Sequence, residues 1–482
     1  MNYKMIRYVL GWIFLFEAAF LLVPFITSLV YRESIVAIYP FSVAVSLSIG
    51  GLLLYRKPKN TALYPKEGFV IVSLSWIVLS LFGTLPFLLS GVTDSFVDAL
   101  FETVSGFSTT GASIFRDVEV LPHSILMWRS FSHWVGGMGV LVFIIAFLPL
   151  SGGRNMHIMR AESPGPSVSK LVPRVKKTAT ILYLIYVIFT ALEFILLLFG
   201  GMSIFEALNT AFATAGTGGF AFLNTGFAGF SSYIQIVVTV FMLLFSVNFS
   251  AYYLAWRGRW RDVMNTELKW FIGIVLTAVG VITLNIYFGG GASLFSSVGE
   301  TLKHVFFSVA SLISTTGFTT ADFNLWPPLA CAVLVLIMFI GACAGSTGGG
   351  MKVSRIVIFV RGLRKEMSRM LHSRQVKKAE LDGKPLDGEL ERSVYTFVIA
   401  YIMVFVTSFL LILIDGKDLV TGFTAVTATL NNIGPGLGQV GPTGNYADFS
   451  VFSKLVLCFN MLAGRLEIFP MLLLFSPHTW KR

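Results

Sequence analysis

The sequence predicts an all-α integral membrane protein with four repeated units, each a span, a polar loop and a second span, and an extra N-terminal hairpin. Three observations lead to this prediction. Of the 482 residues, 55% are hydrophobic and only 13% are charged, a composition typical of integral membrane proteins. Ten apolar segments follow one another along the chain, and nine of them approach the roughly 20 residues that cross a bilayer. Stretches rich in Gly and Thr lie between these segments at four places.

The first two apolar segments form the predicted N-terminal hairpin, residues 1–60. Lys4 and Arg7 precede an apolar run from Tyr8 to about Val30, and a second run begins near Ile35. The first run is longer than the roughly 7–15 apolar residues of a cleaved signal peptide, which predicts a retained span. The other full-length segments begin near Phe69, Ser124, Thr178, Tyr233, Trp270, Ser393 and Phe449.

Positive charge fixes the predicted orientation. Of the 36 Lys and Arg residues, 29 lie at the termini or in the connections that would share the cytoplasmic side. The positive-inside rule then places both termini in the cytoplasm and lets all four polar loops enter from outside. Topology therefore accounts for most of the net charge of +11, and a nucleic-acid role is not favoured.

The four polar loops are internal repeats centred on Gly111, Gly219, Gly317 and Gly434, at intervals of 108, 98 and 117 residues. They divide the chain into predicted repeats 61–155, 156–262, 263–392 and 393–482. A helix-start signal precedes each loop. Ser95, Ser203 and Ser297 open Ser-x-x-acid capping patterns, and Asp418 is a plain N-cap candidate. Cap and glycine are 16 residues apart in three loops and 20 apart in the third.

This spacing predicts a short helix that descends about halfway into the membrane, followed by an extended return. A helix of about 11 residues covers roughly 16 Å, near half the hydrocarbon thickness. Non-helical backbone at this depth is tolerated only inside protein or along a water-filled cavity. The partly negative carboxyl ends of four such helices favour a cation, and backbone carbonyls can replace the hydration shell of a monovalent ion. A single loop of this kind is more often an ordinary external turn, but four matching copies favour an ion pathway.

The predicted filter residues are Thr109, Thr110, Gly111, Thr217, Gly218, Gly219, Thr315, Thr316, Gly317, Asn432, Ile433 and Gly434.

The second span of the third repeat looks broken. Only about 15 apolar residues follow Trp326 before the segment 341–350, in which five of ten residues are glycine and a helix is not sustained. We interpret 341–350 as a gating loop inside the membrane, below the filter. Two alternatives are a helix-packing Gly-x-x-x-Gly face and a phosphate-binding loop, but Met351 and Lys352 stand where the latter needs Gly-Lys-Ser/Thr. The predicted gate residues are Gly345, Ser346, Thr347, Gly348, Gly349, Gly350, Lys352 and Arg465.

Arg465 lies about 16 residues into the last span. A charge at this depth is costly and usually faces a water-filled cavity or a partner. We interpret Arg465 as a positive barrier that lines the pathway, with an ion pair to Glu467 or another acid, or a snorkelling side chain, as alternatives. The other charges within spans are predicted to be structural pairs or interface anchors: Glu17, Arg129, Glu193 and Lys454.

Four repeats of span, pore loop and span in one chain resemble the Trk/Ktr/HKT superfamily of potassium transporters over nearly the whole sequence. The N-terminal hairpin, the stretch Trp134 to Gly139 and the long basic segment after the third repeat are most similar to bacterial TrkH-type pore subunits. The resemblance implies uptake of potassium, and also rubidium, across the cytoplasmic membrane through a single-file filter with one glycine from each loop. It also implies an intramembrane gating loop and an arginine below the filter. The second and fourth loops depart from Thr-x-Gly, so the filter is expected to be only approximately fourfold.

The resemblance further implies a homodimer and a cytosolic ring of nucleotide-binding regulatory subunits of the TrkA type. This chain carries no nucleotide motif, so NAD or ATP would bind to that partner and no cofactor to this chain. The segment Arg355–Arg392 is basic and shows little apolar periodicity, and it is either a solvated linker or the docking surface for the partner.

Two further functional classes remain to be weighed. A symporter coupled to sodium or protons needs a buried carboxylate near the pathway, for which Glu193 is the candidate. A membrane enzyme is not supported, because no cluster of catalytic residue types is present. The six histidines are scattered, and the three cysteines (Cys331, Cys343 and Cys458) lie in apolar stretches, so potassium in the filter is the only metal expected.

Overall fold

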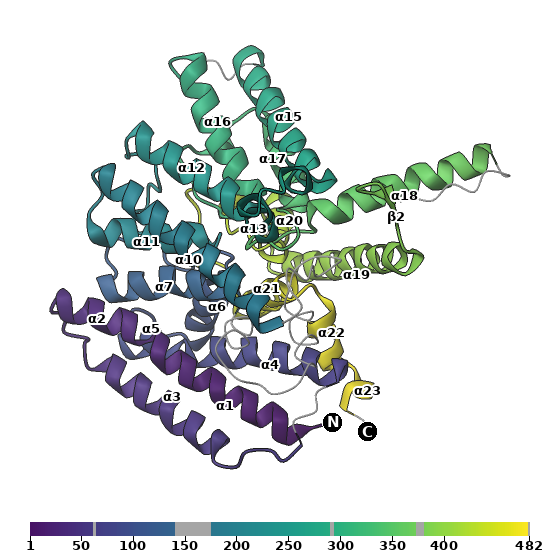
Figure 1. The fold of residues 1–482 in the computed structure, drawn as a ribbon. Coiled ribbons are helices and arrows are strands. Elements are labelled where there is room, and N and C mark those ends of the chain that lie inside the picture. Colours follow the sequence, from purple (N-terminus) through teal and green to yellow (C-terminus); the bar gives the residue numbers. More distant parts are fainter. Residues whose placement is uncertain (61–63, 140–174, 290–293, 373–379, 481–482) are drawn as a thin grey trace.

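A computed structural model describes residues 1–60, 64–139, 175–289, 294–372 and 380–480, and these residues are mostly α-helical with almost no strand, as predicted (Figure 1). The helices are α1 (Tyr3–Phe20), α2 (Leu22–Val30), α3 (Ile38–Leu54), α4 (Pro65–Phe82), α5 (Leu85–Leu89), α6 (Phe96–Phe107), α7 (His123–Gly137), α10 (Val175–Phe199), α11 (Ile204–Ala215), α12 (Ser232–Ser246), α13 (Phe249–Trp256), α14 (Trp260–Val263), α15 (Thr266–Phe288), α16 (Val298–Ile313), α17 (Pro328–Ile340), α18 (Val353–Leu371), α19 (Gly388–Leu413), α20 (Leu419–Leu430), α21 (Val451–Arg465), α22 (Phe469–Phe475) and α23 (Pro477–Trp480). Short 3₁₀ helices cover Phe323–Leu325 and Gly438–Val440, and strands β1 (Glu380–Leu381) and β2 (Lys384–Pro385) pair antiparallel.

Helices α1, α2 and α3 lie together at one end of the molecule, beside α4 (Figure 1). Helices α1 and α3 approach closely where two glycines meet, because a β carbon added at Gly50 would lie only 3.1 Å from the carbonyl oxygen of Gly11. The hairpin predicted for the N-terminus is therefore held by small residues that let two helix backbones approach.

Five helical segments among the described residues are long and apolar enough to cross a membrane: Tyr3–Val30, Pro65–Leu89, Lys177–Phe199, Thr266–Phe288 and Gly388–Leu413. Except for the first, they are the first helices of the four repeats. Helix α3 is shorter, with 17 residues. The other expected crossings are the second helices of the repeats, and within the described residues none of these is a single helix long and apolar enough to cross a membrane.

The expectation that only the third repeat has a broken second helix is wrong. Helix α17 does end at Ile340, as predicted, but α12 and α13 also meet at an angle of 92°. Asn248 causes this break locally, because its side chain accepts the N–H of Ser250 and starts α13. In the fourth repeat α21 ends at Arg465. Shortly after this end, Glu467 and Ile468 both have positive φ.

The four helix starts predicted before the polar loops are confirmed. Ser95, Ser203, Ser297 and Asp418 each accept a backbone N–H three residues later, at 3.2, 3.3, 3.1 and 3.0 Å. Helices α6, α11 and α20 have 12 residues and α16 has 16, so the longer lead-in of the third loop is one additional helical turn. All four helices end four residues before the key glycine.

The basic segment after the third repeat is more structured than its sequence pattern indicated. Its first half is α18, a 19-residue helix that lies beside α19, and its far end extends beyond the other helices (Figure 1). Only the first turns of α18 are buried, through residues such as Val353 and Val357. Residues 373–379 of this segment lie outside the described residues. The basic residues at 154–174, which support the predicted orientation, also lie outside them.

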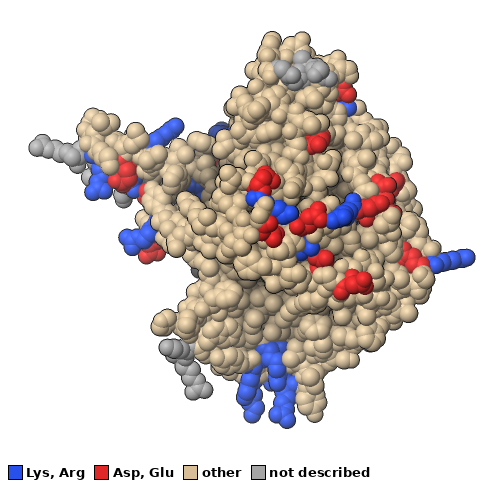
Figure 2. Space-filling view, turned by 180° about the vertical axis from the view of Figure 1, so that it is seen from behind, with Lys and Arg blue, Asp and Glu red and all other residues tan. Residues whose placement is uncertain are grey.

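The surface has a distribution of charge that suits a membrane. On the face shown in Figure 2, acidic and basic side chains gather in a band across the middle, and wide areas beside it carry none. Large apolar side chains such as Leu52, Phe199 and Phe288 are exposed. Apolar surface on this scale is typical of a protein that contacts lipid.

Candidate functional site

The four polar loops meet in a closed ring at the centre of the molecule. A β carbon added to any key glycine would meet a backbone carbonyl oxygen of the next loop along the chain, and the fourth loop meets the first in the same way. These contacts run from Gly111 to Gly218, from Gly219 to Thr316, from Gly317 to Ile433 and from Gly434 to Thr110. In each case the carbonyl belongs to the residue just before the next key glycine. The twelve predicted filter residues are therefore brought together in one register.

The backbone of the four loops shares an unusual conformation. The key glycines have φ between +77° and +93°, and the residue two positions earlier also has positive φ: +58° at Thr109, +53° at Thr217, +62° at Thr315 and +54° at Asn432. Residues other than glycine rarely adopt these backbone angles, because each such residue costs about 1–2 kcal/mol. An ordinary strand turns successive carbonyls to opposite sides, whereas left-handed residues at alternate positions turn them toward one side. Strain of this kind is concentrated at ligand sites.

Hydrogen bonds fix each loop to the end of its own helix. The residue before each key glycine donates its N–H to the carbonyl five residues earlier: Thr110 to Ser105, Gly218 to Ala213, Thr316 to Ser311 and Ile433 to Ala428, at 2.8–2.9 Å. In the first and third loops, serine and threonine hydroxyls add a bond of 2.7 Å. The second and fourth loops lack these hydroxyls, so the ring is only approximately fourfold, as their sequences indicated.

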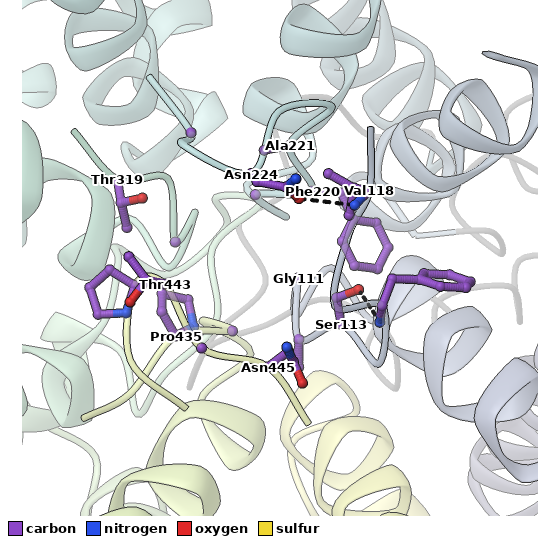
Figure 3. Close-up of a pocket in the computed structure, with 18 of the residues that line it drawn as sticks. Gly111, Ser113, Val118, Phe220, Ala221, Asn224, Thr319, Pro435, Thr443 and Asn445 are labelled. Carbon is purple, nitrogen blue, oxygen red and sulfur yellow. Dashed lines mark hydrogen bonds between the residues drawn. The ribbon is translucent and has the colours of Figure 1, made fainter. Parts of the chain in front are cut away.

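A polar cavity of about 150 Å³ lies directly outside the ring (Figure 3). All four key glycines line it, together with Asn224 and other residues of the outer loops. Asn224 accepts the N–H of Val118 at 2.9 Å and donates to Asp117 at 2.7 Å. The bond from the Asn224 side chain, and a second one from the backbone N–H of Glu119, hold the pKa of Asp117 below its usual value.

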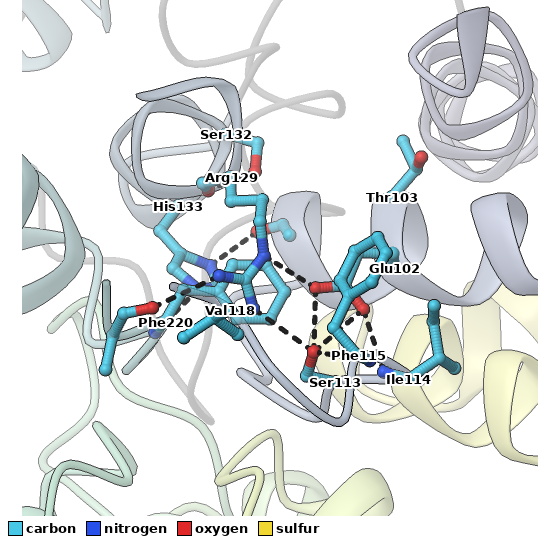
Figure 4. Close-up of polar contacts among 12 residues, drawn as sticks. Glu102, Thr103, Ser113, Ile114, Phe115, Val118, Arg129, Ser132, His133 and Phe220 are labelled. Atoms are coloured by element: carbon cyan, nitrogen blue, oxygen red, sulfur yellow. Dashed lines mark hydrogen bonds and ion pairs between the residues drawn. The ribbon is translucent and has the colours of Figure 1, made fainter. Parts of the chain in front are cut away.

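A buried ion pair lies behind the first two loops (Figure 4). Arg129 on α7 donates through Nε to Glu102 on α6 at 2.7 Å, and both side chains are at most 2% exposed. The same guanidinium donates to Ser113 in the first loop and to the carbonyl of Ala221 after the second. The prediction that Arg129 is a structural pair is confirmed, and the pair connects two neighbouring repeats.

His133, one helical turn after Arg129, supports the second loop directly. Its Nε2 accepts the N–H of Phe220 at 3.2 Å, so the proton sits on Nδ1, which donates to the carbonyl of Gly106 at 2.7 Å. A β carbon at Gly218 would collide with the imidazole ring. Sequence reasoning missed both His133 and Glu102. The available signal was the four-residue spacing of Arg129 and His133, which puts them on one face of a helix.

Replacing Glu102 with glutamine is expected to lower the thermal unfolding temperature in detergent markedly, because it leaves the Arg129 charge buried without a counter-charge. Breaking such a pair costs about 3–5 kcal/mol. The matched control is Asp448→Asn, which breaks the exposed pair with Arg116 and should change stability by less than about 1 kcal/mol. Similar unfolding temperatures for the two variants would contradict the role given to the pair.

The predicted gating loop lies against the inner side of the third and fourth filter loops. The N–H of Gly349 donates to the hydroxyl of Thr315 at 2.6 Å. A β carbon at Gly348 would lie 2.8 Å from the carbonyl of Ser314, and one at Gly349 would collide with that of Asn431. Lys352 is buried, has φ of +75° and donates through Nζ to the carbonyl of Gly348.

Arg465 connects the gating loop to the first repeat. Its Nη1 donates to the carbonyl of Thr347 at 2.7 Å, and its Nη2 donates to that of Gly137 at 2.6 Å. Glu467, which the sequence offered as a partner for Arg465, forms an ion pair with Arg355 of α18. The structure thus brings Arg465 and the loop together, just inside the ring.

The remaining charges within spans divide into two kinds. Lys454 pairs with Asp98 at 2.6 Å, as predicted. Glu17 and Glu193 are completely buried, and neither has an ion-pair partner in the part of the chain that the structure describes, so the prediction of a structural pair or an interface anchor is wrong for these two. Within the same residues, no group of three or more His, Cys, Asp or Glu side chains is placed to hold a metal ion.

Comparisons with known proteins agree with this arrangement. Residues 38–482 match the family model TrkH, described as a cation transport protein. The chain is 37% identical to the Trk system potassium uptake protein TrkH of Escherichia coli K12, and 30% identical to TrkG of the same strain, with 99–100% of each chain covered. The crystal structure of the potassium transporter TrkH from Vibrio parahaemolyticus matches with a TM-score of 0.90 at 32% identity, over 100% of both chains.

Proposed function

The chain belongs to the TrkH family of cation transport proteins, and from this premise we propose that it takes up potassium, and also rubidium, through the ring of four loops. The observation that carries the proposal is the closure of that ring. Four glycines in equivalent positions each contact the carbonyl of the next loop, and the cavity outside opens onto them. The arrangement leaves room for backbone oxygens but for no side chain.

Backbone oxygens supply the proposed selectivity. Carbonyls turned toward one axis replace the hydration shell of a potassium ion, as in other potassium filters. The carboxyl ends of α6, α11, α16 and α20 all lie four residues from the key glycines, so their partial negative charges favour a cation on the inner side. Potassium is the cargo here, and no further cofactor is proposed for this chain.

The gating loop and Arg465 form the proposed gate. The loop rests on the third and fourth filter loops, and the guanidinium places a positive charge inside the ring. In this state both would oppose the passage of a cation. Opening requires two bonds to break. The gating loop must separate from Thr315, and its Thr347 must separate from Arg465. Because α18 continues directly from the loop, a movement of this helix on the inner side would reach the gate.

The rest of the assembly follows from the same proposal. We place the chain in the cytoplasmic membrane of a bacterium with both termini inside, in a homodimer. A cytosolic ring of TrkA-type subunits that bind NAD or ATP would dock on the basic segment Arg355–Arg392. The relatives are named as parts of a Trk system, which supports an assembly of more than one component.

A symporter coupled to sodium or protons is the second candidate. One observation favours it: Glu193 is a fully buried carboxylate on α10, beside Thr214 in the last turn of α11. This position is close to the inner side of the ring. Coupling through Glu193 would make potassium flux depend on a sodium or proton gradient.

Flux into liposomes that contain only this protein tests both candidates. We expect potassium and rubidium to pass at similar rates, and sodium and lithium far more slowly. Equal rates for potassium and sodium would contradict the filter. Potassium flux that stops when sodium is absent and the pH is equal on both sides would favour the symporter. Glu193→Gln should then abolish the dependence on the coupling ion.

A further inference from the structure

Glu267, in the first turn of α15, contacts both ends of the gate. Its Oε1 accepts the N–H of Ala344, inside the gating loop, at 2.7 Å, and the N–H of Ser354, in α18, at 3.0 Å. One oxygen thus joins two positions that are ten residues apart in sequence and enclose most of the gating loop. The glutamate is only 9% exposed, and Ala344 and Ser354 are also buried.

Among the residues that the structure describes, neither N–H donates to a backbone acceptor. Ser354 is the second residue of α18, and the first four N–H groups of a helix have no partner within it. Ala344 lies in non-helical backbone between α17 and α18. A buried N–H left without an acceptor is costly, so these two donors hold the gate to Glu267 in its present position.

The β1–β2 hairpin, residues Glu380–Pro385, connects the same helix start to α18. In its turn, Asp382 accepts the N–H of Thr266 at 2.7 Å, next to Glu267. This satisfies a free donor at the start of α15. On the other side, Arg361 of α18 donates to the carbonyl of Glu380. Asp382 is exposed, in contrast to Glu267.

We propose that Glu267 is a positioning residue that holds the gating loop closed, and that the β1–β2 hairpin keeps Glu267 in place through the bond from Thr266 to Asp382. The proposal rests on the gating role proposed above. Loss of the bond from Thr266 to Asp382 shifts the start of α15. Glu267 then withdraws its oxygen from Ala344 and Ser354, and the loop can leave the filter.

The test is potassium flux through the full chain in liposomes without any partner. Glu267→Ala should raise basal flux by about fivefold or more, within the usual range of coupling between sites. Glu267→Gln keeps an oxygen that can accept both N–H groups and should stay near the original rate. Asp382→Ala should raise flux less than Glu267→Ala, and Asp382→Asn should not. The ratio of potassium to sodium flux should be unchanged in all four.

Asp262→Ala is the matched control, because it removes an acidic side chain five residues before Glu267 that pairs only locally with Arg259. Hydrogen exchange supplies a readout that a purely structural role would not move. In Asp382→Ala, the amides of Ala344 and Ser354 should exchange faster while those of the four filter loops do not. This measurement also decides the matter if Glu267→Ala fails to fold.

Two results would overturn the proposal: basal flux that stays unchanged in Glu267→Ala, or an equal rise in Glu267→Ala and Glu267→Gln. Unchanged exchange at both amides in Asp382→Ala would overturn the part given to the hairpin. Deleting Ala344–Gly349 in the same assay separates this failure from that of the gate itself. If the deletion raises flux and Glu267→Ala does not, only the present proposal fails, and if neither raises flux, the gating role fails.

Discussion

Gly317→Ser is expected to remove most of the preference for potassium over sodium while the protein still folds and inserts. Gly317 has φ of +85°, and a β carbon there would collide with the carbonyl oxygen of Ile433 and lie 2.8 Å from the Pro435 ring. That carbonyl is one of the four in the ring. To admit the serine, the fourth loop must move, and the spacing of oxygens around a dehydrated ion changes with it.

The matched control for this substitution is Gly416→Ser. Gly416 also has positive φ, +71°, but a β carbon there would meet nothing within 4 Å. Both variants carry the backbone cost of about 1–2 kcal/mol for a side chain in the left-handed region, and only one disturbs the ring. Fluxes of potassium and sodium into liposomes should differ between them. Selectivity that stays unchanged in Gly317→Ser would contradict the filter.

The sequence predicted those features that depend on a few neighbouring residues. The caps at Ser95, Ser203, Ser297 and Asp418 are local, since each side chain bonds a backbone N–H three residues away. The break after Ile340 could also be predicted, because glycine destabilises the interior of a helix and is favoured just after its end. The break at Asn248 was missed, since one polar residue in an apolar run usually finds a partner without ending the helix.

Contacts between repeats could not be predicted in the same way. Glu102 and Arg129 are 27 residues apart, and Glu267 and Ala344 are 77 apart. Nothing in either local sequence identifies the partner, and an acid in the first turn of a helix, such as Glu267, is equally typical of a simple cap. The positive φ of Thr109, Thr217 and Thr315 was also unforeseen, because threonine disfavours it and only the closed ring imposes it.

The third repeat is where the ring and the gate meet. Its pore helix, α16, is one turn longer than the others, and Thr315 is the filter residue whose hydroxyl accepts a bond from the gating loop. The repeat also supplies Glu267, α18 and the β1–β2 hairpin. In the proposed mechanism, filter and gate therefore meet mainly in this repeat, and Arg465 of the fourth repeat adds a second contact to the gating loop.

Deleting Ala344–Gly349 is expected to raise potassium flux about tenfold or more without any regulatory partner, because the open state of a closed two-state protein is usually populated at about 10% or less. The deletion removes the bond from Gly349 to Thr315 and the one from Arg465 to Thr347. It should not unfold the molecule, because the ends of the loop are already adjacent: a β carbon at Gly341 would lie 2.7 Å from Cα of Gly350.

Selectivity distinguishes an opened gate from a damaged filter. The four filter loops lie outside the deletion, so the ratio of potassium to sodium flux should match that of the intact chain. A rise in both fluxes with loss of that ratio would mean that the loop supports the filter structurally. When the deletion is combined with Gly317→Ser, flux should be high and should show no preference for potassium over sodium, because the two changes act on different parts of the pathway. Unchanged flux in a deletion variant that inserts and purifies normally would rule out gating by this loop.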